Sequence, residues 1–142
     1  MQDYQVTSLS FKQSAVVPYR LVKGEIKILL ITTRKGRWII PKGIIEPELS
    51  AAESAAKEAL EEAGVVGKIA AEELGKYSYE KWGGTCRVRV FLLRVTKMLD
   101  TWEEQFFRRR KWLPLKEAIT TVEDEALQKI LKKVANVVGG RR

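Results

Sequence analysis

Apolar residues recur along the first third of the chain in a pattern that predicts two neighbouring β-strands. Residues 14–21 and 25–33 are rich in aliphatic side chains, and Gly24 separates them at the position of a turn. The second segment would place apolar side chains on both of its faces: Ile26, Ile28 and Leu30 on one, Leu29 and Ile31 on the other. A strand covered on both faces is typical of the middle of a layered sandwich.

Further strands are predicted in the centre of the chain. Residues 75–80 and 85–95 alternate between apolar and polar positions, and we expect them to form an antiparallel pair that turns at Gly83–Gly84. Residues 38–40 and 111–113 predict two shorter strands, the second ending at Pro114. Strands that flank a helical segment indicate an α/β domain.

The C-terminal segment predicts an amphipathic helix over residues 124–138. Its apolar side chains fall on one stripe and should cover the sheet: Leu127, Ile130, Leu131, Val134 and Val138. The residues that follow, 139–142, are expected to form a frayed tail.

A second helix is predicted between residues 50 and 64, with its own start and stop signals. Ser50 followed by Glu53 has the spacing of a capping box, and Gly64 has the left-handed freedom that closes a last turn. We expect the sheet-facing side to carry small side chains that allow a close approach: Ala52, Ala56, Ala59 and Ala63.

Three carboxylates, Glu58, Glu61 and Glu62, crowd the end of this helix and share one patch. A solvated acidic face is the ordinary explanation for such charges. Here, however, like charges four residues apart repel, and acidic groups near a helix C-terminus oppose its dipole. A bound divalent cation would compensate, and oxygen-only ligands favour a hard ion such as Mg²⁺ or Mn²⁺.

Composition narrows the classes of protein. The chain has 142 residues, of which 45% are hydrophobic, and this size suits one domain over residues 1–142. It contains no histidine and a single cysteine, Cys86. Histidine-dependent triads, histidine-ligated zinc and an internal disulfide are therefore excluded. We expect a cytoplasmic protein, because a single cysteine suits a reducing compartment. We also expect a soluble one, because no apolar run approaches the roughly 20 residues of a membrane span.

The formal charge of +8, from 26 basic and 18 acidic residues, would suit nucleic acid, an anionic membrane or a polyphosphate ligand. Arg34, Lys35 and Arg37 precede the strand at 38–40, and Lys42 precedes Gly43, so these cations should face the acidic helix. A second basic run, residues 108–111, would either add to this entrance or form a solvated loop. Nucleic acid is disfavoured because no basic stripe is interleaved with aromatic residues.

The aromatic residues leave a nucleobase site undecided. Trp38 and Trp112 flank predicted strands, and packing in the core explains them. Four others could line a pocket, although strand alternation alone accounts for the first two: Tyr77, Tyr79, Trp82 and Phe91.

The stretch from Gly43 to Val65 resembles the Nudix box. The pattern matches at Gly43, Glu58, Ala59, Glu61, Glu62, Gly64 and Val65, and departs at Leu49 and Lys57, where the family has glutamate and arginine. In the family those two residues pair and brace the loop against the helix. Losing both avoids the cost of one unpaired buried charge.

This resemblance implies a Nudix-type α/β/α sandwich with a mixed central sheet. It also implies that Glu58, Glu62 and the carbonyl group of Gly43 bind Mg²⁺ or Mn²⁺, and that Glu61 binds metal or activates water. The ion would lower the pKa of a bound water that attacks a phosphoanhydride. Outside the box, Glu103 and Glu104 are candidates for an additional carboxylate by their position.

Beyond the box, residues 15–134 resemble the diphosphoinositol polyphosphate phosphohydrolase branch and its bacterial relatives. The likeness lies in Val17–Arg20, Gly36–Trp38, Pro41–Gly43 and Trp102–Glu104, with the arginines and Trp112 that follow. It implies a diphosphoinositol or diadenosine polyphosphate substrate. The candidate phosphate contacts are Arg20, Arg34, Lys35, Arg37, Lys42, Arg87, and Arg109 or Arg110.

Two alternatives stay open at this point. The departures at Leu49 and Lys57 are compatible with a binding module that kept the fold and lost the chemistry. The positive charge is compatible with a pyrophosphohydrolase acting on RNA 5′ ends, whose affinity would fall steeply with salt. The sequence leaves the oligomeric state open.

Overall fold

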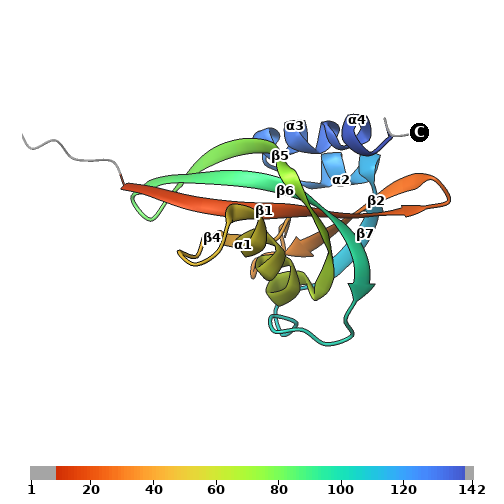
Figure 1. Ribbon diagram of the computed structural model, residues 1–142, viewed down its shortest axis with the longest axis horizontal. Coiled ribbons are helices and arrows are strands. Elements are labelled where there is room, and N and C mark those ends of the chain that lie inside the picture. The colour runs from red at the N-terminus through yellow and green to blue at the C-terminus, as the bar shows by residue number, and fades with distance from the viewer. Residues whose placement is uncertain (1–8, 140–142) are drawn as a thin grey trace, which may run out of the picture.

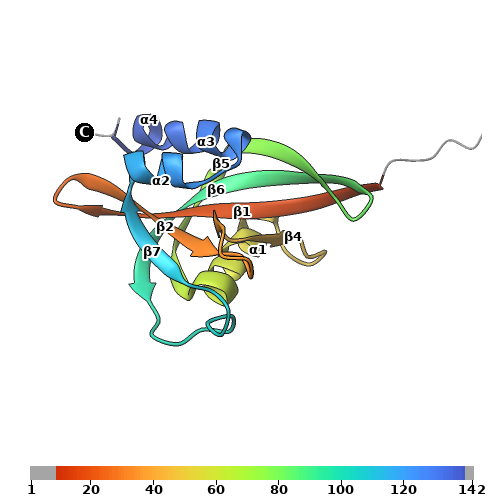
Figure 2. The same cartoon turned by 180° about the vertical axis from the view of Figure 1, so that it is seen from behind.

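A mixed β-sheet forms the middle layer of the molecule, as the computed structural model shows for the described residues 9–139 (Figures 1 and 2). The strands are β1 (Leu9–Val22), β2 (Glu25–Thr32), β3 (Trp38–Ile39), β4 (Lys42–Ile44), β5 (Val65–Lys81), β6 (Gly84–Met98) and β7 (Arg110–Pro114). The helical elements are α1 (Ala51–Glu58), the π-helical turn η1 (Ala59–Ala63), α2 (Leu115–Thr121), α3 (Glu125–Lys132) and α4 (Val134–Val138). Both views place α1 on one side of the sheet and α2 to α4 on the other. The predicted α/β/α sandwich is confirmed.

The central strand of the sheet is β1, which has different neighbours along its length. The order is β3-β2-β1-β6-β5, with β4 also paired to β1 and β7 to β2. β1 runs parallel to β6 and antiparallel to β2 and β4. Because β2 pairs with residues 19–22 and β4 with residues 13–15, the two antiparallel partners occupy opposite halves of β1.

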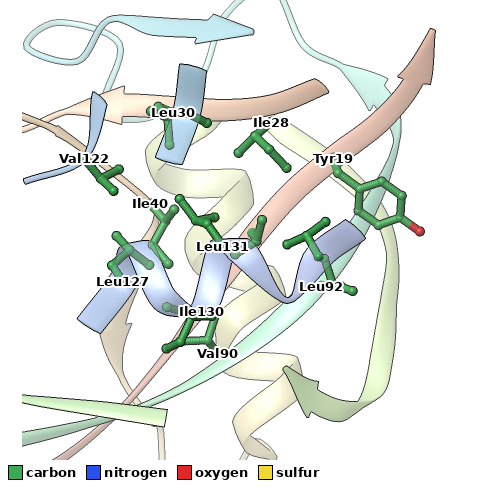
Figure 3. Close-up of a cluster of buried hydrophobic side chains, with 14 of the residues drawn as sticks. Tyr19, Ile28, Leu30, Ile40, Val90, Leu92, Val122, Leu127, Ile130 and Leu131 are labelled. Atoms are coloured by element: carbon green, nitrogen blue, oxygen red, sulfur yellow. The ribbon is translucent and has the colours of Figure 1, made fainter. Parts of the chain in front are cut away.

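Each face of the sheet carries its own hydrophobic core. Figure 3 shows the larger core, in which Leu127, Ile130 and Leu131 of α3 pack on Ile28 and Leu30 of β2 and on strand β6. On the opposite face Leu29 and Ile31 join alanines of α1 and η1. The predicted alternation of apolar side chains along β2 is therefore confirmed.

The helix predicted at 50–64 begins as expected and ends differently. Ser50 Oγ accepts from the Glu53 backbone N–H at 3.0 Å, and the Glu53 side chain accepts from the Ser50 N–H at 2.8 Å, which confirms the capping box. Gly64 ends the element with φ of 66°. The last turn, however, is the π-helical η1.

The prediction that Ala52, Ala56, Ala59 and Ala63 face the sheet is confirmed for Ala59 and Ala63, which are fully buried, whereas Ala52 and Ala56 are only partly buried. The fully or nearly buried alanines lie four residues apart: Ala51, Ala55, Ala59 and Ala63. A regular helix would rotate the last of these away from the sheet, but the wider π turn accommodates a spacing of four residues.

Several elements differ in their bounds from those that the sequence pattern predicts. β5 begins at Val65 rather than at residue 75, and irregular pairing with β6 between Val66 and Gly75 interrupts its alternation. β4 and α2 were not predicted. The C-terminal helix divides at Lys133 into α3 and α4, with the expected stripe facing the core. Of the predicted frayed tail, residues 140–142 lie outside the described residues, as do residues 1–8 of the predicted domain.

Candidate metal and phosphate site

Helix α1 brings the Glu58 carboxylate against the backbone of β4. Gly43 lies opposite Ser14 of β1 in the antiparallel ladder. A Cβ atom at position 43 would stand less than 3.0 Å from the carboxyl carbon and both oxygens of Glu58. Any other residue at this position would therefore displace the Glu58 side chain, and glycine is what permits its close approach to the strand.

Glu62 is buried beside Glu58 and is held by two neighbours. The Lys42 backbone N–H donates to Glu62 Oε1 at 3.1 Å. The Arg108 guanidinium lies 3.5 Å from Glu62 Oε2, with both side chains largely buried. Glu62 projects inward from η1, so the π turn that keeps Ala63 on the sheet also directs this carboxylate toward β4.

The two carboxyl groups are difficult to ionise together. Burial and the neighbouring Glu62 charge raise the pKa of Glu58 to about 8, and a hydrogen bond to Glu62 adds to this shift. Burial also raises the pKa of Glu62, although the Arg108 charge opposes the change. A pair that resists carrying two negative charges near neutral pH favours a bound cation. The ligands of such a cation would be carboxylate and carbonyl oxygens, which suit the hard ions Mg²⁺ and Mn²⁺.

Glu61 does not share this position with Glu58 and Glu62. Its carboxylate lies 3.8 Å from Lys57 Nζ and is partly exposed. Burial and the nearby Glu103 raise its pKa. Across residues 9–139, no group of three or more histidine, cysteine or acidic side chains is arranged to hold a metal ion. The structure thus brings together two of the three predicted carboxylates, and the role of Glu61 stays a prediction.

Lys57 has a partner that sequence reasoning did not identify. Its Nζ atom lies 2.7 Å from Glu46 Oε2, so the loop and the helix are joined by an ion pair. Glu46 stands three residues before Leu49, where the Nudix pattern has glutamate. The resemblance predicts that the ion pair between the loop and the helix is lost, but Glu46 and Lys57 form such a pair from a different loop position.

Arg108 connects the carboxylate pair to the loop between β6 and β7. Besides Glu62, it contacts Glu104 at 2.8 Å and donates to the Thr32 carbonyl group at 2.8 Å. Arg108 belongs to the predicted basic run at 108–111 but was not among the predicted site residues. The i,i+4 spacing of Glu104 and Arg108 was the available signal.

The cations predicted to form a basic entrance lie on two loops that are distant in sequence and joined in the fold. Thr32 N donates to the Arg109 carbonyl at 3.0 Å, and Thr32 Oγ1 accepts from Arg109 N at 2.8 Å. These bonds fix the loop at 33–37 beside the Arg108 loop. The exposed cations on the two loops are Arg34, Lys35, Arg37 and Arg109.

The Lys42 side chain extends to the aromatic ring of Tyr79 and also interacts with the Glu62 charge. Its Nζ atom lies 5.2 Å from the ring centre of Tyr79, and burial lowers its pKa. It lines a cavity of about 200 Å³ together with Arg37, Trp38, Ile39, Tyr77, Tyr79, Val122, Glu123, Asp124 and Leu127. The cavity therefore has cationic and aromatic walls. Of the other aromatic candidates, Phe91 is buried and Trp82 packs on Phe11.

Two further predicted phosphate contacts, Arg87 and Arg20, lie in different parts of the molecule. Arg87 is exposed on β6 and lines a groove of about 360 Å³ that also includes Ile45. Arg20 stacks on Trp112 at 4.2 Å, at the far end of β1. It is six residues from Ser14, or about 20 Å along an extended strand.

Arg110 has a structural role. Its guanidinium donates to the carbonyl groups of Ala63 and Leu99 at 2.9 and 2.6 Å and stacks on Trp102 at 3.8 Å. Because these contacts tie the end of η1 to the following loops, we assign Arg110 to the fold rather than to the substrate site.

The fold and the site together define an α/β sandwich domain with an acidic helix facing a glycine-containing strand. Residues 11–134 match the family model of the NUDIX domain. The chain belongs to the Nudix family, and its relatives are named as hydrolases.

Curated relatives include proteins from plants and mammals. The chain is 39% identical to "Nudix hydrolase 21, chloroplastic" of Arabidopsis thaliana over 84% of its own length, and it spans 64% of that relative. It is 31% identical to "Nudix hydrolase 13, mitochondrial", covering 96% of this chain and 80% of the relative. It is 34% identical to "Diphosphoinositol polyphosphate phosphohydrolase 2" of Rattus norvegicus, covering 79% of this chain and 63% of the relative.

Solved structures support the fold. A C. elegans Ap4A hydrolase superposes with a TM-score of 0.76 at 24% identity, covering 92% of this chain and 99% of the other. The NUDIX domain of Shewanella oneidensis NrtR, complexed with ADP ribose, superposes with a TM-score of 0.74 at 15% identity over 96% and 94% of the two chains. Within the described residues, no helix has the length and apolar character needed to cross a membrane. The predicted cytoplasmic location stays a prediction.

Proposed function

We propose that this protein hydrolyses phosphoanhydride bonds in a polyphosphorylated small molecule with the help of Mg²⁺ or Mn²⁺. The observation that carries this proposal is the buried Glu58–Glu62 pair facing Gly43. Both carboxyl groups have raised pKa values, and a divalent ion would relieve their repulsion. Relatives named as hydrolases support the same chemistry.

Each residue would have a distinct task in the reaction. Glu58, Glu62 and the carbonyl of Gly43 would hold the ion, which would polarise a phosphoryl oxygen and lower the pKa of a bound water. Glu61 is the candidate base, since burial and the nearby Glu103 raise its pKa and make its carboxylate a stronger proton acceptor. Arg108 keeps Glu62 oriented through their close contact.

The exposed cations at the entrance would bind the remaining phosphates of the substrate. Arg34, Lys35 and Arg37 approach from one loop and Arg109 from the other, and several cations suit several phosphates. The candidate substrates are diphosphoinositol polyphosphates and diadenosine polyphosphates. The aromatic walls of the cavity at Lys42 favour the second class, because a nucleobase would find stacking surfaces there.

The test is a hydrolysis assay with both substrate classes in Mg²⁺, in which products are separated by chromatography. The proposal predicts turnover by the native protein and a loss of about 100-fold or more in Glu62→Gln, by analogy with the removal of other electrostatic groups from active sites. Glu48→Gln, in the exposed loop before α1, is the matched control and should retain full activity. Equal turnover in Glu62→Gln would remove this residue from the mechanism.

The alternative of a binding module rests on the departures at Leu49 and Lys57. The Glu46–Lys57 ion pair weakens that basis, since the loop is still joined to the helix. A substrate that binds in calorimetry with Mg²⁺ but is recovered intact after long incubation would favour the binding module over the enzyme.

A further inference from the structure

Ser14 carries a buried hydroxyl group that the fold leaves without a partner. The residue is fully buried on β1, and among the described residues its Oγ atom is the one buried side-chain oxygen or nitrogen that makes no hydrogen bond. An unsatisfied buried hydroxyl is costly, and native proteins retain few of them. Its presence therefore indicates a state of the protein in which it is bonded.

Two independent observations place this hydroxyl beside Glu58. Ser14 precedes Val16 by two residues, and Val16 packs in the core beneath α1, so both side chains point to the face that α1 covers. Ser14 also lies opposite Gly43, and side chains of directly opposed residues stand about 5 Å apart on the same face. The Glu58 carboxylate fills the position of the Gly43 side chain. It is thus the neighbour of the Ser14 hydroxyl.

We propose that Ser14 is a positioning residue for Glu58, and that its hydroxyl donates a hydrogen bond to the Glu58 carboxylate when that carboxylate holds a divalent ion. The Ser14 hydroxyl is a buried donor beside Glu58 that no other group in the described residues uses. Carboxylates that bind metal ions are themselves generally oriented by such hydrogen bonds.

This inference rests on the proposed function only in requiring that Glu58 bind a metal ion. The measurement is the dissociation constant for Mn²⁺, obtained by electron paramagnetic resonance of free Mn²⁺ in the absence of substrate. Ser14→Ala should bind Mn²⁺ about 10-fold more weakly than the native protein, the lower end of the range for groups that orient metal ligands. Its melting temperature in EDTA should not fall, because the lost hydroxyl had no partner.

Ser54 provides a matched control in α1. It is equally buried, but its Oγ atom accepts a hydrogen bond from the Glu46 N–H at 3.0 Å. Ser54→Ala should therefore lower the melting temperature and leave the Mn²⁺ affinity unchanged. The activity of Ser14→Ala should also recover when Mg²⁺ is raised about tenfold, because the defect lies in metal affinity.

The outcomes separate this inference from the proposed function. If the native protein binds no Mn²⁺, both are overturned. If the native protein binds Mn²⁺ and hydrolyses substrate while Ser14→Ala binds Mn²⁺ equally well, the role of Ser14 alone is overturned. If Ser14→Ala melts far below the native protein in EDTA, the hydroxyl serves the fold, and the inference is again wrong.

Discussion

At the scale of single residues, the site is defined by two carboxyl groups that the fold forces together. Glu58 lies in the space that Gly43 leaves free, and Glu62 is buried between the Lys42 backbone and Arg108. The Arg108 and Lys42 contacts favour ionised Glu62, but burial outweighs them and raises the pKa of both carboxyl groups, so ionising the pair does not stabilise the metal-free protein. The arrangement is therefore better explained by a ligand than by folding.

This conclusion predicts an unusual effect of pH on stability. The pKa of Glu58 is about 8 in the folded protein and ordinarily 4.5, so the folded state favours the protonated form. Its contribution to stability is present below about pH 4.5 and is lost as pH rises through about 8. Glu58→Gln keeps a neutral group, and in EDTA at pH 8.5 it should melt about 2–4 °C above the native protein, since solvent screening limits the effect to roughly 1 kcal/mol.

Excess Mg²⁺ should reverse this order, because only the native protein gains the bound ion. Differential scanning calorimetry with and without Mg²⁺ provides the measurement. A native protein that melts above Glu58→Gln in EDTA at pH 8.5 would contradict the assignment of the raised pKa to Glu58.

At the scale of elements, the sequence predicted what depends on local pattern. The capping box at Ser50, the stop at Gly64 and the two-faced strand β2 were all readable, because each depends on residues a few positions apart. The first half of β5 was not, since its irregular register breaks the alternation. The π turn was also missed, because it is defined by backbone geometry that no residue type marks.

The Glu46–Lys57 ion pair gives a second prediction, at the junction of loop and helix. Because Lys57 also lies near Glu61, reversal of either charge should displace the loop and lower kcat, by about 10-fold for a group that positions others. Glu46→Lys and Lys57→Glu should each show this loss.

The double variant restores an ion pair and should recover most of the activity. Steady-state kinetics on the four proteins gives the coupling between the two positions. Losses that simply add in the double variant would show that the two residues act independently.

At the scale of the whole molecule, the fold gathers cations that the sequence scatters. Arg37 and Arg109 are separated by 72 positions, yet the bonds of Thr32 place their loops side by side. The sequence predicted a basic entrance at the first loop, and left open whether the second basic run adds to it or forms a solvated loop. The contact between Glu62 and Arg108 could not be read from the chain, because it depends on how the loop after β6 returns to the sheet.

The cationic entrance predicts that salt weakens substrate binding. Raising NaCl from about 0.05 to about 0.5 M shortens the screening length from about 14 to about 4 Å and should raise KM several-fold with little change in kcat. A Lys35→Gln, Arg109→Gln double variant should show a higher KM and a weaker salt dependence.

Lys116→Gln, on α2 at the other side of the sheet, is the matched control and should behave as the native protein does. A KM that does not respond to salt, or equal responses in the double variant and the native protein, would contradict the role of the two loops.

The central claim is that Glu58, Glu62 and Gly43 hold the divalent ion used in hydrolysis. The most direct measurement is an anomalous difference map from crystals grown with Mn²⁺ and a non-hydrolysable polyphosphate analogue. We predict a Mn²⁺ peak bounded by the two carboxylates and the Gly43 carbonyl, with the phosphates of the analogue directed toward the loop at 33–37. A map with ordered analogue and no peak at this position would contradict the claim.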